Sequence, residues 1–169
     1  MRLRNLVLLA IAVSSCDSSA PSGPPCANPD GGSFTGSAVD VGNLAGCASY
    51  AITSSGGSPA MGLVISTGPI SAPTLVVNLG RLGDRPAAGT YNVGTGAGEF
   101  IGSIILNPGS QSFSLVSGTI TIDVSTLAGV NGSLGGSMNI TGTRAGAGGS
   151  LILSGNFTAV CSVGGSVSC

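Results

Sequence analysis

The feature that most constrains the fold is a strict alternation of apolar and polar residues near the end of the chain. In the segment G-T-I-T-I-D-V-S, residues 118–125, the apolar side chains fall at even positions and the polar ones at odd positions. The same period of two recurs over residues 134–141 and 151–159. This period is typical of antiparallel strands with one face on a core. We expect the following residues to form that apolar face: Ile120, Ile122, Val124, Leu134, Gly136, Met138, Ile140, Leu151, Leu153, Phe157 and Ala159.

Glycine-bearing breaks separate these runs at residues 128–132 and 144–149, and they predict the turns of a C-terminal meander. The middle segments M-G-L-V-I-S and P-T-L-V-V-N-L are apolar on both faces, which favours a sheet covered on both sides. Further strands are predicted over residues 35–41, 47–53, 61–66, 74–79, 89–93, 99–106 and 111–117.

Many short strands at this spacing predict an all-β fold, either an antiparallel β-sandwich or a closed barrel of about eight to ten strands. A stacked β-solenoid is the alternative for a chain so rich in glycine and serine, but we find no fixed period of about 20 residues. Residues 33–169 have the length of a single domain. Their low charge and positive mean hydropathy favour a folded core over disorder.

The first 15 residues have the layout of a secretory signal peptide: two early arginines, the apolar run L-V-L-L-A-I-A-V, and two small residues. The apolar run is far shorter than the roughly 20 residues that a membrane span requires. Residues 13–16, V-S-S-C, resemble the lipobox of bacterial lipoproteins. That resemblance implies removal of residues 1–15 and lipidation of Cys16. Residues 16–32, rich in proline and glycine, then have the composition of a flexible tether.

The chain has five cysteines, and setting Cys16 aside leaves four in an oxidising compartment, which favours two disulfides. The end of the chain, C-S-V-G-G-S-V-S-C, is nearly symmetric about its centre. A hairpin with a three-residue loop would place Cys161 opposite Cys169. We therefore predict Cys161–Cys169 and Cys26–Cys47. The main alternative joins Cys47 to Cys161 and Cys26 to Cys169.

The composition argues against catalysis, cofactors and nucleic acid. Without histidine, the commonest general base and every Ser-His or Cys-His arrangement are missing, and zinc has little support. With few arginines and no lysine, there is no basic surface for nucleic acid. Turn formation explains Asp30 and Asp84 more simply than a calcium loop does. The carboxylates within the domain are Asp40, Asp84, Glu99 and Asp123, and we expect solvated charges rather than a glycosidase pair.

Two classes of function remain. The first is a non-catalytic domain, anchored to the membrane through its lipid, that binds an envelope protein or glycan or has a structural role. The second is a carrier of a small apolar ligand in a lipocalin-like barrel cavity. In both cases we expect an exported protein, lipid-anchored on the periplasmic side of the inner or outer membrane or at the cell surface. The sequence indicates no oligomeric state.

Overall fold

The fold is all-β, as the sequence predicts. The computed structural model describes residues 32–55, 58–67, 74–94, 99–107, 111–126, 132–144, 146 and 148–161. Nine strands and no helix occur in this part of the chain. The strands are β1 (Ser33–Ala38), β2 (Gly42–Ser55), β3 (Ser58–Thr67), β4 (Thr74–Leu82), β5 (Gly89–Asn92), β6 (Ile101–Asn107), β7 (Gln111–Ser125), β8 (Ser133–Thr143) and β9 (Ser150–Cys161).

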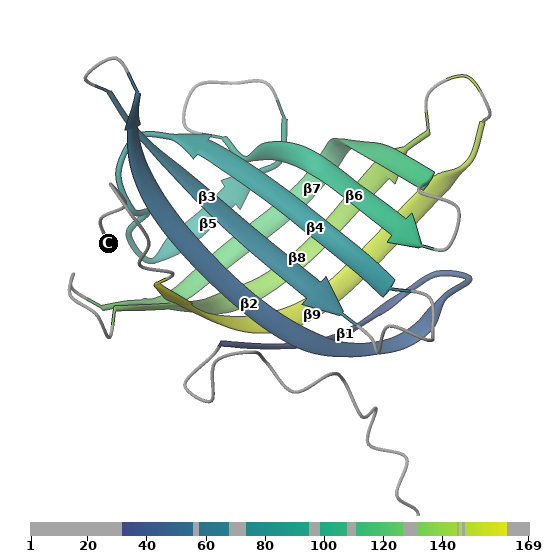
Figure 1. Cartoon of the computed structure of the whole chain (residues 1–169), viewed down its shortest axis with the longest axis horizontal. Coiled ribbons are helices and arrows are strands. Elements are labelled where there is room, and N and C mark those ends of the chain that lie inside the picture. Colours follow the sequence, from purple (N-terminus) through teal and green to yellow (C-terminus); the bar gives the residue numbers. More distant parts are fainter. Residues whose placement is uncertain are drawn as a thin grey trace, which may run out of the picture.

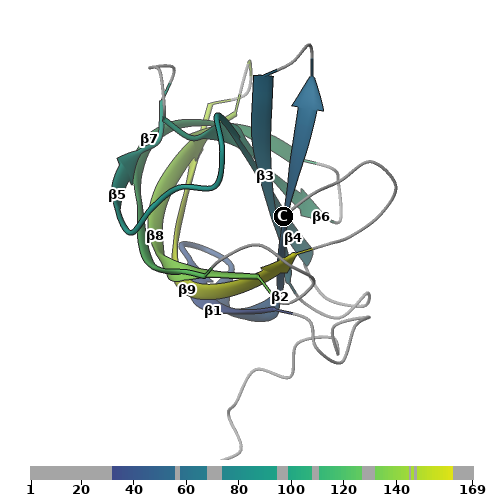
Figure 2. The same cartoon turned by 90° about the vertical axis from the view of Figure 1, so that its left-hand side faces the viewer.

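Eight of these strands close into an antiparallel barrel, seen side-on in Figure 1 and nearly end-on in Figure 2. Around the ring the order is β1, β2, β3, β4, β6, β7, β8 and β9, and β9 pairs with β1 to close it. The short strand β5 is the exception, because it pairs only with the second half of β7. The closed barrel is thus one of the two predicted architectures, and the antiparallel ring is not a solenoid.

The short first strand leaves a small irregularity in the ring. β1 lies between β2 and β9 for six residues, and beyond its start β2 pairs directly with β9 in parallel, Ser49 with Val160 and Tyr50 with Cys161. At its other end β1 turns into β2 through Val39, Asp40 and Val41. Asp40 has a φ of 65° and Gly42 a φ of 96°. Asp and Gly are residues that accept this left-handed conformation at low cost in a hairpin loop.

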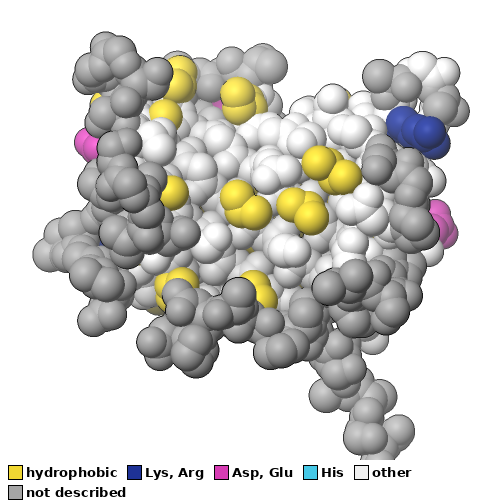
Figure 3. Space-filling view, in the orientation of Figure 1, with side chains coloured by type: hydrophobic (Ala, Val, Ile, Leu, Met, Phe, Trp, Pro, Cys, Tyr) yellow, Lys and Arg dark blue, Asp and Glu magenta, His cyan; other side chains and the backbone are white. Residues whose placement is uncertain are grey.

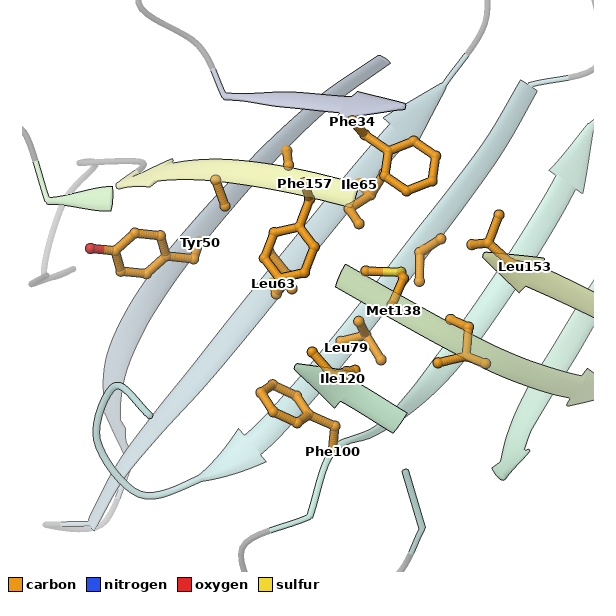
Figure 4. Close-up of a cluster of buried hydrophobic side chains, with 14 of the residues drawn as sticks. Phe34, Tyr50, Leu63, Ile65, Leu79, Phe100, Ile120, Met138, Leu153 and Phe157 are labelled. Carbon is orange, nitrogen blue, oxygen red and sulfur yellow. The ribbon is translucent and has the colours of Figure 1, made fainter. Parts of the chain in front are cut away.

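The interior of the barrel is filled by apolar side chains, as Figure 4 shows for the rings of Phe34, Phe100 and Phe157 and their neighbours. The predicted inward face is confirmed for β8 and β9 and for Ile120 and Ile122. It is wrong for Val124, which is 46% exposed. The ladder between β7 and β8 shifts register between Ile122 and Val124, and such a bulge reverses the facing of the residue that follows it.

Several inward glycines are required because neighbouring backbone approaches them closely. A Cβ on Gly102 would lie 1.9 Å from the carbonyl oxygen of Asn78, and one on Gly136 would lie 1.9 Å from that of Thr121. Glycines of this kind let the strands coil tightly enough to close a small barrel.

The expectation that the middle strands are covered on both faces is wrong. The inward residues of β3 and β4 are buried, but their outward residues lie on the outer wall, where Val64 is 41% exposed. Among the residues that the structure describes, no second layer of strands lies over this wall, because all nine strands belong to one sheet. The apolar outward residues of β3 and β4 therefore need another explanation.

Candidate functional site

Charged side chains are rare on the barrel wall. The outward positions of β1, β8 and β9 are held mainly by serine, threonine and asparagine. All the charged residues within the described ranges lie in turns or near strand ends. These residues are Asp40, Arg81, Asp84, Arg85, Glu99, Asp123 and Arg144.

The carboxylates considered in the sequence do not come together into one site. Asp40 lies in the turn between β1 and β2, whereas Asp84 follows β4 at the opposite end of the barrel. Asp123 is exposed on β7, and Glu99 lies just before β6, next to Gly94. In the part of the chain that the structure describes, no three acidic or cysteine residues are grouped so as to hold a metal ion. Asp30 lies outside the described residues.

One end of the barrel carries an ordered cluster around Tyr91. The guanidinium of Arg81 lies 5.1 Å from the centre of the Tyr91 ring. That ring meets Phe100 edge-on, with 5.9 Å between ring centres. The Tyr91 hydroxyl donates a hydrogen bond to the carbonyl of Ala87 at 2.9 Å. A cation over a ring and an edge-on ring pair are both favourable, so this cluster holds β5 and the preceding loop in place.

Tyr50 is a buried polar residue that the sequence did not single out. Its side chain points into the barrel and is only 1% exposed. The hydroxyl lies on the side of the ring away from Leu63 and Phe157 (Figure 4). This hydroxyl is buried and has no hydrogen-bond partner among the residues that the structure describes. Buried hydroxyls nearly always have a partner, so this one requires an explanation.

The outer wall over β3, β4 and β6 carries an apolar patch with no charge at its centre (Figure 3). Val76 and Ile105 are cross-strand partners, and Val64 lies diagonally from Val76. Leu82 and Ile101 lie nearer one end and are 75% and 52% exposed. We call this set the outer apolar patch: Gly62, Val64, Val76, Gly80, Leu82, Ile101 and Ile105. The signal for it in the sequence was the apolar character of both faces of the middle strands.

The two described cysteines, Cys47 and Cys161, are each disulfide-bonded. A bond between them is excluded by the register of β2 and β9, which places Cys161 level with Tyr50. Cys47 is three residues away along the strand, about 10 Å, and disulfides need Cα atoms within about 7 Å. Cys47 also points outward, whereas Cys161 is buried inside.

The alternative Cys47–Cys161 pairing is therefore wrong. The predicted partners Cys26 and Cys169, the terminal hairpin and the lipidation residue Cys16 lie outside the described residues, so those predictions stand untested.

No family model, curated protein or solved structure matches the chain. Within the described ranges there is also no helix long and apolar enough to cross a membrane.

Proposed function

We propose that the protein is a lipid-anchored lipoprotein of the bacterial cell envelope, and that its barrel is a non-catalytic module with a binding or structural role there. One observation supports the lipid anchor: the cysteine of V-S-S-C comes directly after a positive segment and an apolar run. Two or three acyl chains on Cys16 anchor stably, because each buried methylene contributes about 0.8 kcal/mol. Residues 17–32 then separate the lipid from β1, which begins at Ser33.

A binding or structural role is supported by how the barrel distributes its side chains. The interior is occupied by large apolar residues, including four that are 0% exposed on β3 and β4: Leu63, Ile65, Leu75 and Val77. The acidic residues that could act in catalysis lie apart on turns and strand ends. The outer wall, by contrast, offers hydroxyl and amide groups and one apolar patch. Contacts with a partner are what such a surface can provide.

The test of the anchor is the mass of the mature N-terminus. We expect wild-type protein to begin at Cys16 and to carry acyl chains, and to fractionate with membranes. The Cys16→Ser variant should be uncleaved or soluble, without lipid mass. A matched Ser15→Ala variant keeps the cysteine and should still be lipidated. A wild-type mature chain that begins elsewhere and carries no lipid would overturn the anchor.

A ligand carrier is the second candidate, and the hydroxyl of Tyr50 is the observation that favours it. A barrel of eight strands can hold one small ligand. A buried hydroxyl without a partner could bind the polar end of such a molecule. Native mass spectrometry of protein purified from its host tests this directly. An apolar molecule retained by wild type and lost from Tyr50→Phe would make the carrier role the better proposal.

A further inference from the structure

The outer apolar patch contains two glycines that the barrel itself does not require. Gly62 and Gly80 face outward and are direct partners in the ladder between β3 and β4. No described atom lies within 4 Å of a Cβ built on Gly62, and a Cβ on Gly80 would approach only the carbonyl oxygen of Ile101, at 4.0 Å. Neither residue has a positive φ. Glycine weakens the interior of a strand, and it often marks a place where another molecule approaches the backbone closely.

The inside of the same barrel shows what a glycine pair of this kind accommodates. Gly36 and Gly155 are direct partners between β1 and β9 and face inward. The ring of Phe34 lies over both: a Cβ on Gly155 would be 2.6 Å from the ring, and one on Gly36 would be 2.7 Å from it. An aromatic ring over strand glycines is a known stabilising arrangement in sheets. On the outer wall the corresponding pair has no ring over it among the described residues.

We propose that the Gly62–Gly80 pair is the docking site for an aromatic side chain of a partner polypeptide. On this face Ala60 and Val64 flank the pair on β3, Asn78 and Leu82 flank it on β4, and Ile101 lies opposite Gly80 on β6. Four apolar side chains and one amide would therefore surround the edge of a ring that rests on the bare backbone. The inference names the partner class for the binding role proposed above, and it does not depend on the lipid anchor.

The lack of charge and the small area of the outer apolar patch favour a single aromatic side chain over a charged polymer or a second copy of the chain. The described outward side chains of β3, β4 and β6 include no charged residue, so the wall attracts neither a polyanion nor a strongly basic segment. The patch spans three strands and about six residues, or about 300 Å² from ordinary strand spacings. A stable dimer buries about 800 Å² on each partner, so a second copy would need much more contact than this face offers. One aromatic anchor, the commonest hot-spot residue at interfaces, fits the available area.

The experiment is a titration of the isotope-labelled full chain with short uncharged peptides, followed by two-dimensional amide NMR. The probes are Ac-Gly-Trp-Gly-amide, Ac-Gly-Leu-Gly-amide and methyl β-glucoside. We expect the tryptophan peptide to shift the amides of Gly62, Gly80 and Ile101, and the leucine peptide to bind these residues much more weakly. Gly62→Val should lower the affinity for the tryptophan peptide by about tenfold or more, the size of one good hot-spot contact.

Gly62→Val should preserve the fold, because the new side chain enters open space and valine is favoured in strands. The melting temperature should therefore be unchanged or higher while binding is weakened. Ser137→Val, on the outer wall of β8, adds a similar side chain elsewhere and should leave binding intact. Three results would each overturn the proposal: no shift at the patch, equal binding of the leucine peptide, or binding of the glucoside in place of the peptides. None of these results bears on lipidation of Cys16.

Discussion

Replacing Tyr50 by phenylalanine should stabilise the protein, which is unusual for a change in a barrel core. The variant removes one oxygen and leaves the ring, so its packing in the barrel core, beside its cross-strand partner Leu63, is kept. In the wild type the hydroxyl has left water without gaining a hydrogen bond to any described residue. A buried donor or acceptor without a partner costs about 1–3 kcal/mol. We therefore expect the free energy of unfolding to rise by about 1 kcal/mol, or about 3 °C in melting temperature for a domain of this size.

The assay is urea unfolding under non-reducing conditions, followed by circular dichroism because tyrosine fluorescence would change with the substitution. If the urea midpoint rises and the dependence of the unfolding free energy on urea concentration is unchanged, the substitution has changed the stability of the folded state. Tyr91→Phe is the matched control, because the Tyr91 hydroxyl donates to the carbonyl of Ala87 at 2.9 Å. Loss of this hydrogen bond should lower the free energy of unfolding by about 0.5–1 kcal/mol. The changes in stability of the two variants should therefore have opposite signs.

A fall in stability of about 1 kcal/mol or more in Tyr50→Phe would refute this reasoning. It would mean that the hydroxyl does have a partner in the folded protein, either an ordered water or a bound ligand. Native mass spectrometry of the two proteins then separates a water from a ligand, because only the ligand adds retained mass.

Three further predictions concern two glycines and the cysteines. Gly136→Ala should destabilise the barrel by several kcal/mol or prevent folding, since its Cβ would lie 1.9 Å from the carbonyl oxygen of Thr121, and denaturant midpoints measure this. Gly80→Ala should instead be neutral or stabilising by about 0.5–1 kcal/mol, and a large loss there would show that its outer face is covered. Non-reducing peptide mapping should find no peptide that links Cys47 to Cys161, and such a link would contradict the observed register of β2 and β9.

The strands were predictable because their apolar residues keep a period of two, and because glycines mark the breaks. The alternation over β8 and β9 gave the inward face correctly. The choice between a sandwich and a barrel was not predictable, because it depends on whether β1 reaches β9, and residues so far apart leave no local pattern. Val124 was misplaced because a bulge changes the facing of later residues without altering the sequence period.

The outer apolar patch shows a second limit of sequence reasoning. Apolar residues on both faces of β3 and β4 indicated a covered sheet, but the same pattern also arises when the outer face is a contact surface. Gly62 and Gly80 are 18 positions apart in the chain, and only the register makes them partners. Tyr50 raised no expectation because its neighbours Ala48 and Ile52 share its inward face, so it fits the alternation like any core residue.

Closure of the ring by the first and last strands is the central structural claim, since an open sheet would expose the interior that we describe as filled. The most direct measurement is the set of backbone NOEs across β1 and β9 in the labelled protein. We predict cross-strand NOEs that pair Thr35 with Asn156, Gly36 with Gly155 and Ser37 with Ser154. If β1 instead shows NOEs to β2 alone, and β9 shows NOEs to β8 alone, the barrel is open and the account is wrong.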